Sequence, residues 1–465
     1  MTEPADPDRP ERGGGYKWTV VGMLWFICFF NYADRQALFA VFPLLQKQYG
    51  FDKEQLGLIG AAFTWVYALS APFAGQTADR LPRKALILGG LTVWSIITGF
   101  TAACSRVWHF VLVRGAEGLG ETFYFPASMS VISDYHGPRT RSRAMSLHQT
   151  SVYAGTIGGS AFAGWMGLRY GWSSSFIALG AAGCVLGIVL AGFLREPRRS
   201  SARVQDANRL ESSTSPIPVL AGQNPAEASR RGRVGHNQPL ASGETVPMGR
   251  FLAELACTPT ALLLILAFFG ANFVALVFLT WMPTFLKEKF HLNLAAAGLE
   301  ATIFIQLSSM AGAGAGGWLA DRWRTRRPGG RILAQATGAL AGGPFIFLCG
   351  FTRDRGTLIL AMSLFGLAKG LYDANIWAAL YDVVTPTRRA TAVGLMNMVG
   401  WLGGGLGAYA IGLTVTRWHL TMSQAIESTA LIYVGVAALL LVAALAFAPR
   451  DIRRASEPAQ PPPEL

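Results

Sequence analysis

Charged residues are scarce in this chain of 465 residues, of which only 14% are Asp, Glu, Lys or Arg and 51% are hydrophobic. Soluble domains carry about 25% charged residues, so the shortage indicates lipid rather than water as the main solvent. The five cysteines are scattered without paired spacing, which excludes a disulfide framework or a cysteine metal site. Paired histidine ligands, a nucleophile elbow and a soluble domain to house a catalytic site are also missing, so we expect no enzyme, no cofactor and no metal.

Long apolar stretches fill most of the chain instead. A helix that crosses the hydrocarbon core needs roughly 20 apolar residues, whereas a membrane β-barrel shows short alternating segments, and none occur here. The sequence therefore predicts an all-α membrane protein with twelve transmembrane helices. They lie at about 17–43, 55–78, 85–104, 108–134, 144–168, 173–194, 260–284, 295–320, 331–350, 357–383, 390–414 and 425–448.

The net charge of +13 is distributed unevenly along the chain. Most of the 40 lysines and arginines fall in the predicted tails and even-numbered loops. This is the positive-inside asymmetry, which places both termini in the cytoplasm. Topology thus explains the charge without nucleic acid. We expect a monomeric, multi-pass protein of the cell (inner or plasma) membrane, with the lipid bilayer as its main partner.

A polar segment of about 198–248 separates the predicted helices six and six. Ser, Pro, Ala, Gly and Arg dominate it and apolar periodicity is lost, which is typical of a disordered linker. The predicted organisation is a cytoplasmic tail at 1–16, a six-helix bundle at 17–194, a cytoplasmic linker at 195–257, a second six-helix bundle at 258–448 and a cytoplasmic tail at 449–465.

The two halves repeat each other's loop motifs. The run 75–84 (Gly-Gln-Thr-Ala-Asp-Arg-Leu-Pro-Arg-Lys) after the second helix matches 317–324 (Gly-Trp-Leu-Ala-Asp-Arg-Trp-Arg) after the eighth. The run 134–141 after the fourth helix matches 382–389 after the tenth, with one shift of 248 for an Asp, a Pro and an Arg. Such a repeat predicts two pseudo-symmetric bundles with a binding site at their interface.

The loop at 75–84 resembles the Gly-x-x-x-Asp-Arg-x-x-Arg-Lys signature of the major facilitator superfamily, and the likeness spans nearly the whole chain. One departure is Pro82, where the family usually has Gly, and a proline stiffens the turn. The resemblance implies a role in gating between the halves. The gating candidates are Gly75, Asp79, Arg80, Arg83, Asp134, Arg141, Asp321 and Arg322.

Five ionisable residues lie inside two predicted spans, the first and the fourth. Each costs about 2.5–3.5 kcal/mol in lipid, so such residues usually face a cavity and carry function. Arg114, Glu117 and Glu121 are spaced by three and four and share one helix face. Asp34 and Arg35 lie about 100° apart on their helix, so each needs a different partner.

These residues favour a site that binds an anion and a proton. Guanidinium groups suit carboxylates and phosphates, so Arg35 and Arg114 are candidates for anion binding. Asp34 and Glu121 are proton-carrier candidates, because an anion that reaches a neighbouring arginine changes the environment of a buried carboxylate. Glu117 belongs to the same set, although it can simply neutralise Arg114. The alternative for all five is a set of permanent ion pairs that fix helix packing.

Other polar residues inside predicted spans can line the pathway, or can equally form packing hydrogen bonds between helices. Lys369 and Asp373 are four apart and can neutralise each other, and by the shift of 248 Lys369 corresponds to Glu121. The further substrate-binding candidates are Asn31, Gln149, Tyr153, Asn272, Gln306, Lys369 and Asn375.

Two subfamilies are similar to this pattern. Asp34 and Arg35, with Arg114 and Glu121 seven apart, resemble the anion:cation symporters of sugar acids and organic anions, which implies proton-coupled symport of a small organic anion by alternating access. The runs 31–35 and 114–121 also resemble spinster-type transporters, which implies a lysolipid or another amphipathic solute. A membrane nutrient sensor is a third possibility, but it needs an ordered signalling segment, and the central linker is low-complexity.

Overall fold

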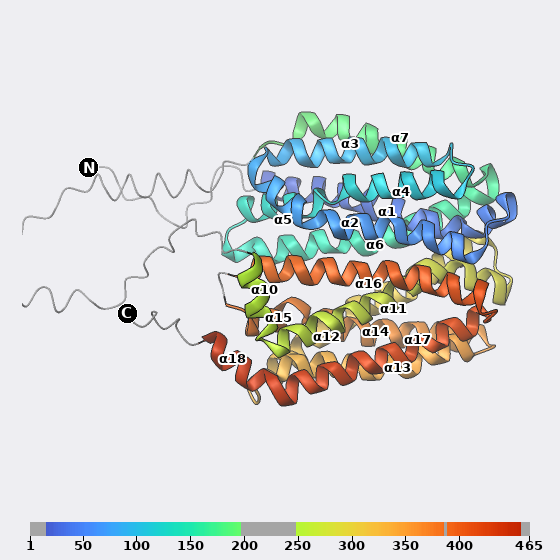
Figure 1. Cartoon of the computed structure of the whole chain (residues 1–465). Coiled ribbons are helices and arrows are strands. Elements are labelled where there is room, and N and C mark those ends of the chain that lie inside the picture. Colours follow the sequence, from blue (N-terminus) through green and yellow to red (C-terminus); the bar gives the residue numbers. More distant parts are fainter. Residues whose placement is uncertain (1–14, 197–247, 386–387, 457–465) are drawn as a thin grey trace, which may run out of the picture.

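The computed structural model describes residues 15–196, 248–385 and 388–456, and within them every regular element is a helix. Figure 1 shows two bundles side by side, the first from blue to green and the second from yellow to red. The first described helix begins, and the last described helix ends, on the same side of the molecule, which we call the terminal end. The opposite side is called the far end.

All twelve predicted spans are present in the described residues, and the prediction of two six-helix bundles is confirmed. Nine described helical segments are long and apolar enough to cross a membrane. The first bundle consists of α1 (Tyr16–Tyr49), α2 (Lys53–Arg80), α3 (Arg83–Thr101), α4 (Val107–Glu121), α5 (Tyr124–Tyr135), α6 (Pro138–Tyr170) and α7 (Trp172–Phe193). The second consists of α11 (Pro259–Phe290), α12 (Leu294–Arg324), α13 (Gly330–Phe351), α14 (Arg355–Asp373), α15 (Ile376–Val383), α16 (Arg389–Arg417) and α17 (Met422–Val442).

The fourth span is broken into α4 and α5 directly after Glu121. Pro126 explains the break, because proline has no N–H and its ring clashes with the carbonyl four residues earlier, at Thr122. The Thr122 hydroxyl donates to the Gly118 carbonyl at 2.8 Å, a contact that also bends helices. As a result Glu121 is the last residue of α4 rather than part of a continuous helix.

Two short helices lie in segments that the sequence analysis assigned to the linker and the C-terminal tail, so the prediction was wrong for those residues. The predicted linker at 195–257 ends in α10 (Met248–Ala256), because Phe251 and Leu255 form a buried apolar face at a spacing of four. The predicted tail at 449–465 begins with α18 (Ala448–Ser456), which continues α17 through the π-helical turn η2 (Ala443–Phe447). The other residues of the predicted linker and tails, at 1–14, 197–247 and 457–465, lie outside the described residues.

Each bundle contains an equivalent ion pair between an arginine and an aspartate at the terminal end. Arg83 pairs with Asp134 in the first bundle. The equivalent residues of the repeat form a pair in the second bundle, where Arg331 Nη1 lies 2.9 Å from Asp382 Oδ1. Both residues of the second pair follow those of the first by 248 positions. The repeat seen in the sequence is therefore also a repeat of side-chain contacts.

The two bundles contact each other at the far end. Arg417 Nε of α16 donates to Glu54 Oε2 of α2 at 2.7 Å, and Lys53 Nζ lies 2.6 Å from Glu288 Oε2 of α11. Two glycines allow backbones from opposite bundles to meet there. A Cβ at Gly412 would lie 2.1 Å from the Lys53 carbonyl oxygen, and one at Gly164 would lie 2.5 Å from that of Leu294. Helix α16 therefore packs on α2, and α6 packs on α12.

Candidate functional site

The five ionisable residues predicted in the first and fourth spans form one cluster inside the first bundle. Asp34 and Arg35 come from α1, while Arg114, Glu117 and Glu121 come from α4. None of the five is more than 8% exposed. Gly118 lets α4 approach α2 closely, where an added Cβ would lie 2.5 Å from the Phe63 carbonyl oxygen, and the Phe63 ring lies near both Arg35 and Arg114.

Two ion pairs organise the cluster. Arg35 Nε donates to Glu121 Oε2 at 2.5 Å, and Arg114 Nη1 donates to Glu117 Oε2 at 2.5 Å. The second pair has the i,i+3 spacing that the sequence indicates. Asp34 does not pair with Arg35, as expected from their positions on α1, and its Oδ2 atom instead lies 3.3 Å from the Thr98 hydroxyl. The same hydroxyl lies 3.1 Å from Glu117 Oε1.

Carboxylates outnumber guanidinium groups in this cluster. One oxygen from each of Asp34, Glu117 and Glu121 lies within 4.8 Å of the others. With every group ionised, three negative charges face the two positive charges of Arg35 and Arg114. A buried net charge is costly, and one proton on a carboxylate removes it. The oxygens are spaced closely enough to hold a cation, but two of the three carboxylates are already held by arginines.

Aromatic rings from both bundles surround Arg35. Its Cζ atom lies 4.7 Å from the ring centroid of Tyr32, 4.6 Å from Phe63 and 4.9 Å from Tyr67. Trp401 of α16 adds a fourth ring at 5.8 Å from the second bundle. Cation–π contacts of this kind stabilise a desolvated guanidinium by about 2 kcal/mol or more. The cage places Arg35 at the interface between the two bundles.

Several buried polar atoms of the cluster, and one atom a helical turn before Arg35 on α1, have no hydrogen-bond partner among the described residues. A buried polar group without a partner costs about 1–3 kcal/mol, so a polar ligand that satisfies it gains that amount. Such atoms therefore mark where a ligand is best stabilised. They are Asn31 Nδ2, Asp34 Oδ1, Arg35 Nη1, Arg114 Nε and Glu121 Oε1.

The predicted polar residues of the second bundle are more dispersed. Lys369 pairs with Asp373 on α14, and Tyr153 of α6 lies within electrostatic reach of both. Asn375, which precedes α15, donates through Nδ2 to the Gly316 carbonyl of α12 at 3.1 Å.

The remaining three candidates differ in their surroundings. Asn272 Nδ2 donates to the Phe268 carbonyl of its own helix at 2.9 Å. Gln306 is buried on α12, whereas Gln149 is exposed on α6. These three are therefore not gathered around Arg35 by any contact in the described residues.

The predicted gating residues lie at the terminal end. Arg83 and Asp134 form the ion pair described above, and Arg141 Nη2 donates to the Ser133 carbonyl at 3.3 Å. Asp321, with a side chain 78% exposed, lies 3.9 Å from Arg331, and Arg322 is also exposed. The side chains of Asp79 and Arg80, and the exposure of Gly75, lie outside what the structure describes.

Sequence reasoning missed five residues of these sites. Thr98, Phe63, Tyr67 and Trp401 are single polar or aromatic residues in apolar helices, and nothing in their spacing distinguishes them from packing residues. Arg331 could have been found, because it follows Arg83 by the same 248 positions as the other repeated residues.

Two repeated bundles of membrane-length helices, with a buried charge cluster against their interface, define a membrane transporter. The sequence model described as "Major Facilitator Superfamily" matches residues 24–408, and the chain belongs to this superfamily. It is a transporter rather than an enzyme.

Curated relatives are similar over most of the chain. The probable galactarate/D-glucarate transporter GudP of Escherichia coli (strain K12) is 24% identical over 454 residues, which cover 96% of each chain. The hexuronate transporter of Bacillus subtilis (strain 168) is 23% identical, covering 86% of this chain and 88% of its own. The probable anion transporter 4, chloroplastic, of Oryza sativa is 27% identical over 86% of this chain, but the match spans only 64% of that protein.

A solved structure has the same fold. The bacterial homologue of the human lysosomal transporter spinster, in an inward-facing and unoccupied conformation, superposes with a TM-score of 0.75 at 20% identity. The match covers 94% of this chain and 98% of that one.

Proposed function

We propose that this protein is a secondary active transporter that moves a small organic anion, such as a sugar acid, together with a proton. The observation that carries the proposal is the state of Arg35. One nitrogen of its guanidinium holds Glu121, while Nη1 is buried without a hydrogen-bond partner among the residues that the structure describes, in a cage that residues of both bundles complete. A planar guanidinium suits a carboxylate.

The Arg35–Glu121 pair provides a direct way to couple the two ligands. A proton on Glu121 removes its charge and weakens its hold on Arg35, which then pairs with the carboxylate of the substrate. The proton also cancels the charge that the substrate brings into the buried cluster. Without the proton on Glu121, anion binding adds an uncompensated negative charge in a low-dielectric site, which is strongly unfavourable.

The position of the Thr98 hydroxyl supports the presence of a proton on one carboxyl group of the cluster. A hydroxyl has one hydrogen to donate, yet the Thr98 hydroxyl lies within 3.3 Å of oxygens from both Asp34 and Glu117. Both contacts are separate two-centre hydrogen bonds only when one of the two carboxyl groups carries a proton and donates to the Thr98 oxygen. Asp34 is the better candidate, because Glu117 already accepts from Arg114.

The names of the relatives support the substrate class. GudP is named for galactarate and D-glucarate, and the Bacillus subtilis relative is named for hexuronate. Sugar acids of this kind present a carboxylate, which is the group that the geometry around Arg35 suits best.

The proposed orientation places the terminal end in the cytoplasm of the cell. Arginines concentrate at that end, including Arg83, Arg141 and Arg331, as the positive-inside asymmetry requires. The contacts between the bundles then close the outer side, so that the described state is closed toward the outside of the cell.

Transport by the purified protein in proteoliposomes tests the proposal. We expect galactarate, D-glucarate or a hexuronate to accumulate inside vesicles when a proton gradient is imposed, and a protonophore to abolish this accumulation. Accumulation that a protonophore leaves intact would contradict proton coupling. Movement of a lysophospholipid but of no sugar acid would instead favour the spinster-type alternative.

A further inference from the structure

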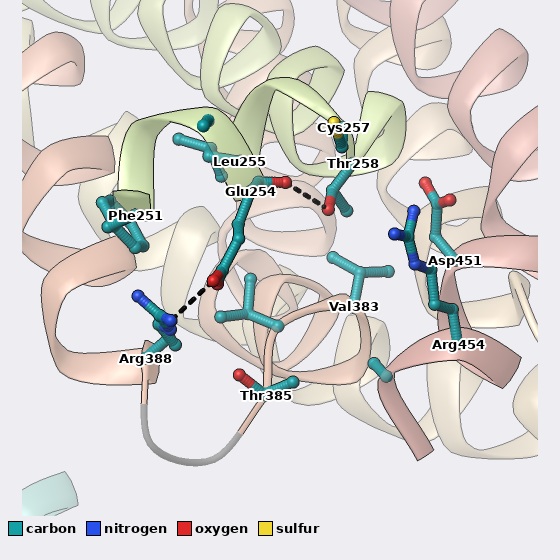
Figure 2. Close-up of a pocket in the computed structure, with 13 residues that line it drawn as sticks. Phe251, Glu254, Leu255, Cys257, Thr258, Val383, Thr385, Arg388, Asp451 and Arg454 are labelled. Carbon is teal, nitrogen blue, oxygen red and sulfur yellow. Dashed lines mark hydrogen bonds and ion pairs between the residues drawn. The ribbon is translucent and has the colours of Figure 1, made fainter. Parts of the chain in front are cut away.

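A pocket of about 480 Å³ lies at the terminal end of the second bundle, apart from the central charge cluster. Figure 2 shows α10 above it, Thr385 after α15 and Arg388 before α16 below it, and α18 at one side. These three elements come from distant parts of the second half of the chain. The proposed transport function makes no use of this pocket.

The lining of the pocket combines apolar walls with two arginines. Phe251, Leu255 and Val383 provide apolar surface from α10 and α15. Arg388 lies on the side of Phe251, and Arg454 lies on the opposite side (Figure 2). This arrangement suits a ligand with apolar parts and a negatively charged group.

Each acidic residue of the lining has a hydrogen-bond partner, whereas neither arginine has all of its donors paired within the described residues. Arg388 Nη2 donates to Glu254 Oε1 at 2.7 Å, and Asp451 Oδ2 accepts from the Thr260 amide at 3.0 Å. Arg388 Nη1 is buried and has no partner within the described part of the chain. Arg454 forms no ion pair with any residue that the structure describes. The pocket therefore offers guanidinium N–H donors to a negatively charged group.

The position of the pocket indicates where that ligand comes from. Helix α11 begins at Pro259 and α16 at Arg389, so the pocket lies at the level where membrane spans end. Helix α10 runs across the axes of the spanning helices (Figure 1), buries Phe251 and Leu255, and leaves Leu252 45% exposed. Amphipathic helices with this orientation lie among lipid headgroups.

We propose that this pocket binds the phosphate headgroup of an anionic membrane phospholipid. Arginine forks match phosphate oxygens, and basic pockets at helix ends are suited to anionic headgroups. The pocket volume falls within the range of small-molecule sites. The apolar walls of α10 and α15 contact the glycerol and the first acyl carbons, while Arg388 and Arg454 bind the phosphate.

Thermal unfolding of the full-length protein in a neutral detergent tests the proposal, because a ligand that binds the folded state raises the melting temperature. The probes are phosphatidylglycerol, phosphatidylcholine and inorganic phosphate. The variants are Arg454→Gln and Arg388→Gln/Arg454→Gln. Arg453→Gln is the matched control, since Arg453 lies on the same helix but does not line the pocket.

We expect phosphatidylglycerol to stabilise the protein far more than the other two probes. We also expect its apparent affinity to fall several-fold in Arg454→Gln, because solvent screens this exposed arginine, and at least about tenfold in the double variant, because a buried charge-assisted donor is then lost as well. Arg454 is exposed and forms no ion pair with any described residue, so the single variant tests the site even if the double variant misfolds. An equal loss in Arg453→Gln, equal stabilisation by phosphatidylcholine or phosphate, or an unchanged affinity in Arg454→Gln overturns the proposal.

Discussion

Arg35 Nε lies 2.5 Å from Glu121 Oε2, while Nη1 of the same guanidinium has no hydrogen-bond partner among the described residues. One arginine thus holds the carboxylate proposed to carry a proton and presents a free donor to an anion. This relationship makes the roles of the two residues separable by experiment.

Removing the titratable group at position 121 should uncouple transport from the proton gradient. In Glu121→Gln the amide cannot ionise, so the cluster is fixed in a state equivalent to protonation. We expect gradient-driven accumulation to be lost, while counterflow exchange of substrate across proteoliposomes remains measurable. Glu300→Gln is the matched control, because Glu300 pairs with Arg355 away from the cluster. Accumulation that persists in Glu121→Gln would show that another group carries the proton.

Replacing the guanidinium with an ammonium should weaken substrate binding while keeping the charge. In Arg35→Lys a single ammonium cannot hold Glu121 and a substrate carboxylate with the geometry of a planar fork. The loss of a charge-assisted hydrogen bond, about 1.5–3 kcal/mol, predicts roughly 10- to 100-fold weaker binding. The measurement is the substrate concentration that half-saturates counterflow, with Arg355→Lys as control. An affinity equal to that of the wild type would remove Arg35 from the binding site.

Side chains added at the far-end glycines should prevent that end from closing. A Cβ at Gly412 would lie 2.1 Å from a backbone oxygen of the other bundle, and one at Gly164 would lie 2.5 Å from another. Overpacking of this kind costs about 1–3 kcal/mol. We expect Gly412→Val and Gly164→Val to reduce transport roughly 10- to 100-fold and to retain substrate-induced thermal stabilisation.

A cysteine introduced at position 416 measures whether the far end is closed, because the Thr416 hydroxyl accepts a hydrogen bond from the Glu54 amide where the two bundles meet. Its alkylation should become faster in the valine variants. Gly435→Val is the control, since a Cβ there meets no atom within 4 Å. Alkylation as slow as in the parent protein would mean that the end still closes.

His136, in the connection between α5 and α6, should make stability depend on pH. Its ring nitrogens lie 3.1 Å from Thr140 Oγ1 and 3.2 Å from the Lys17 carbonyl oxygen, and burial lowers the pKa of His136. The unfolded chain then binds the proton more tightly than the folded chain, so stability is full above about pH 6.5 and falls as the pH drops below that value.

Melting temperatures measured from about pH 8 to about pH 5 check this expectation. His136→Gln should flatten the decline below pH 6.5, and the exposed His419→Gln serves as the control. A decline that is identical in His136→Gln and the parent protein would assign the pH dependence to other groups.

Much of the fold could be predicted from the sequence, because apolar length and helical spacing are local properties. The twelve spans follow from runs of apolar residues. Arg114, Glu117 and Glu121 share a face because residues three and four apart are neighbours on any helix. The repeat at a shift of 248 predicted two bundles, and Asp134 and Asp382 indeed occupy equivalent positions.

Features that depend on tertiary contacts could not be predicted in the same way. Thr98 is recognisable only once α3 lies against Asp34 and Glu117, and Trp401 only once α16 reaches Arg35. The break after Glu121 has a sequence cause in Pro126, but a proline can also kink a helix without ending it. Helix α10 is too short for its apolar face to stand out from the polar segment before it.

The ion pairs between the bundles at the far end are more exposed to solvent than the ion pairs of the central cluster. Glu288 and Arg417 are 39% and 66% exposed in their ion pairs, whereas Glu121 is fully buried in its own. Dissolved salt screens exposed charges over about 8 Å at physiological ionic strength and about 3 Å at 1 M, but it barely reaches a buried pair. For the transport function proposed above, the salinity of the medium at the far end therefore biases which way the empty protein faces and leaves the chemistry of the ligand site unchanged.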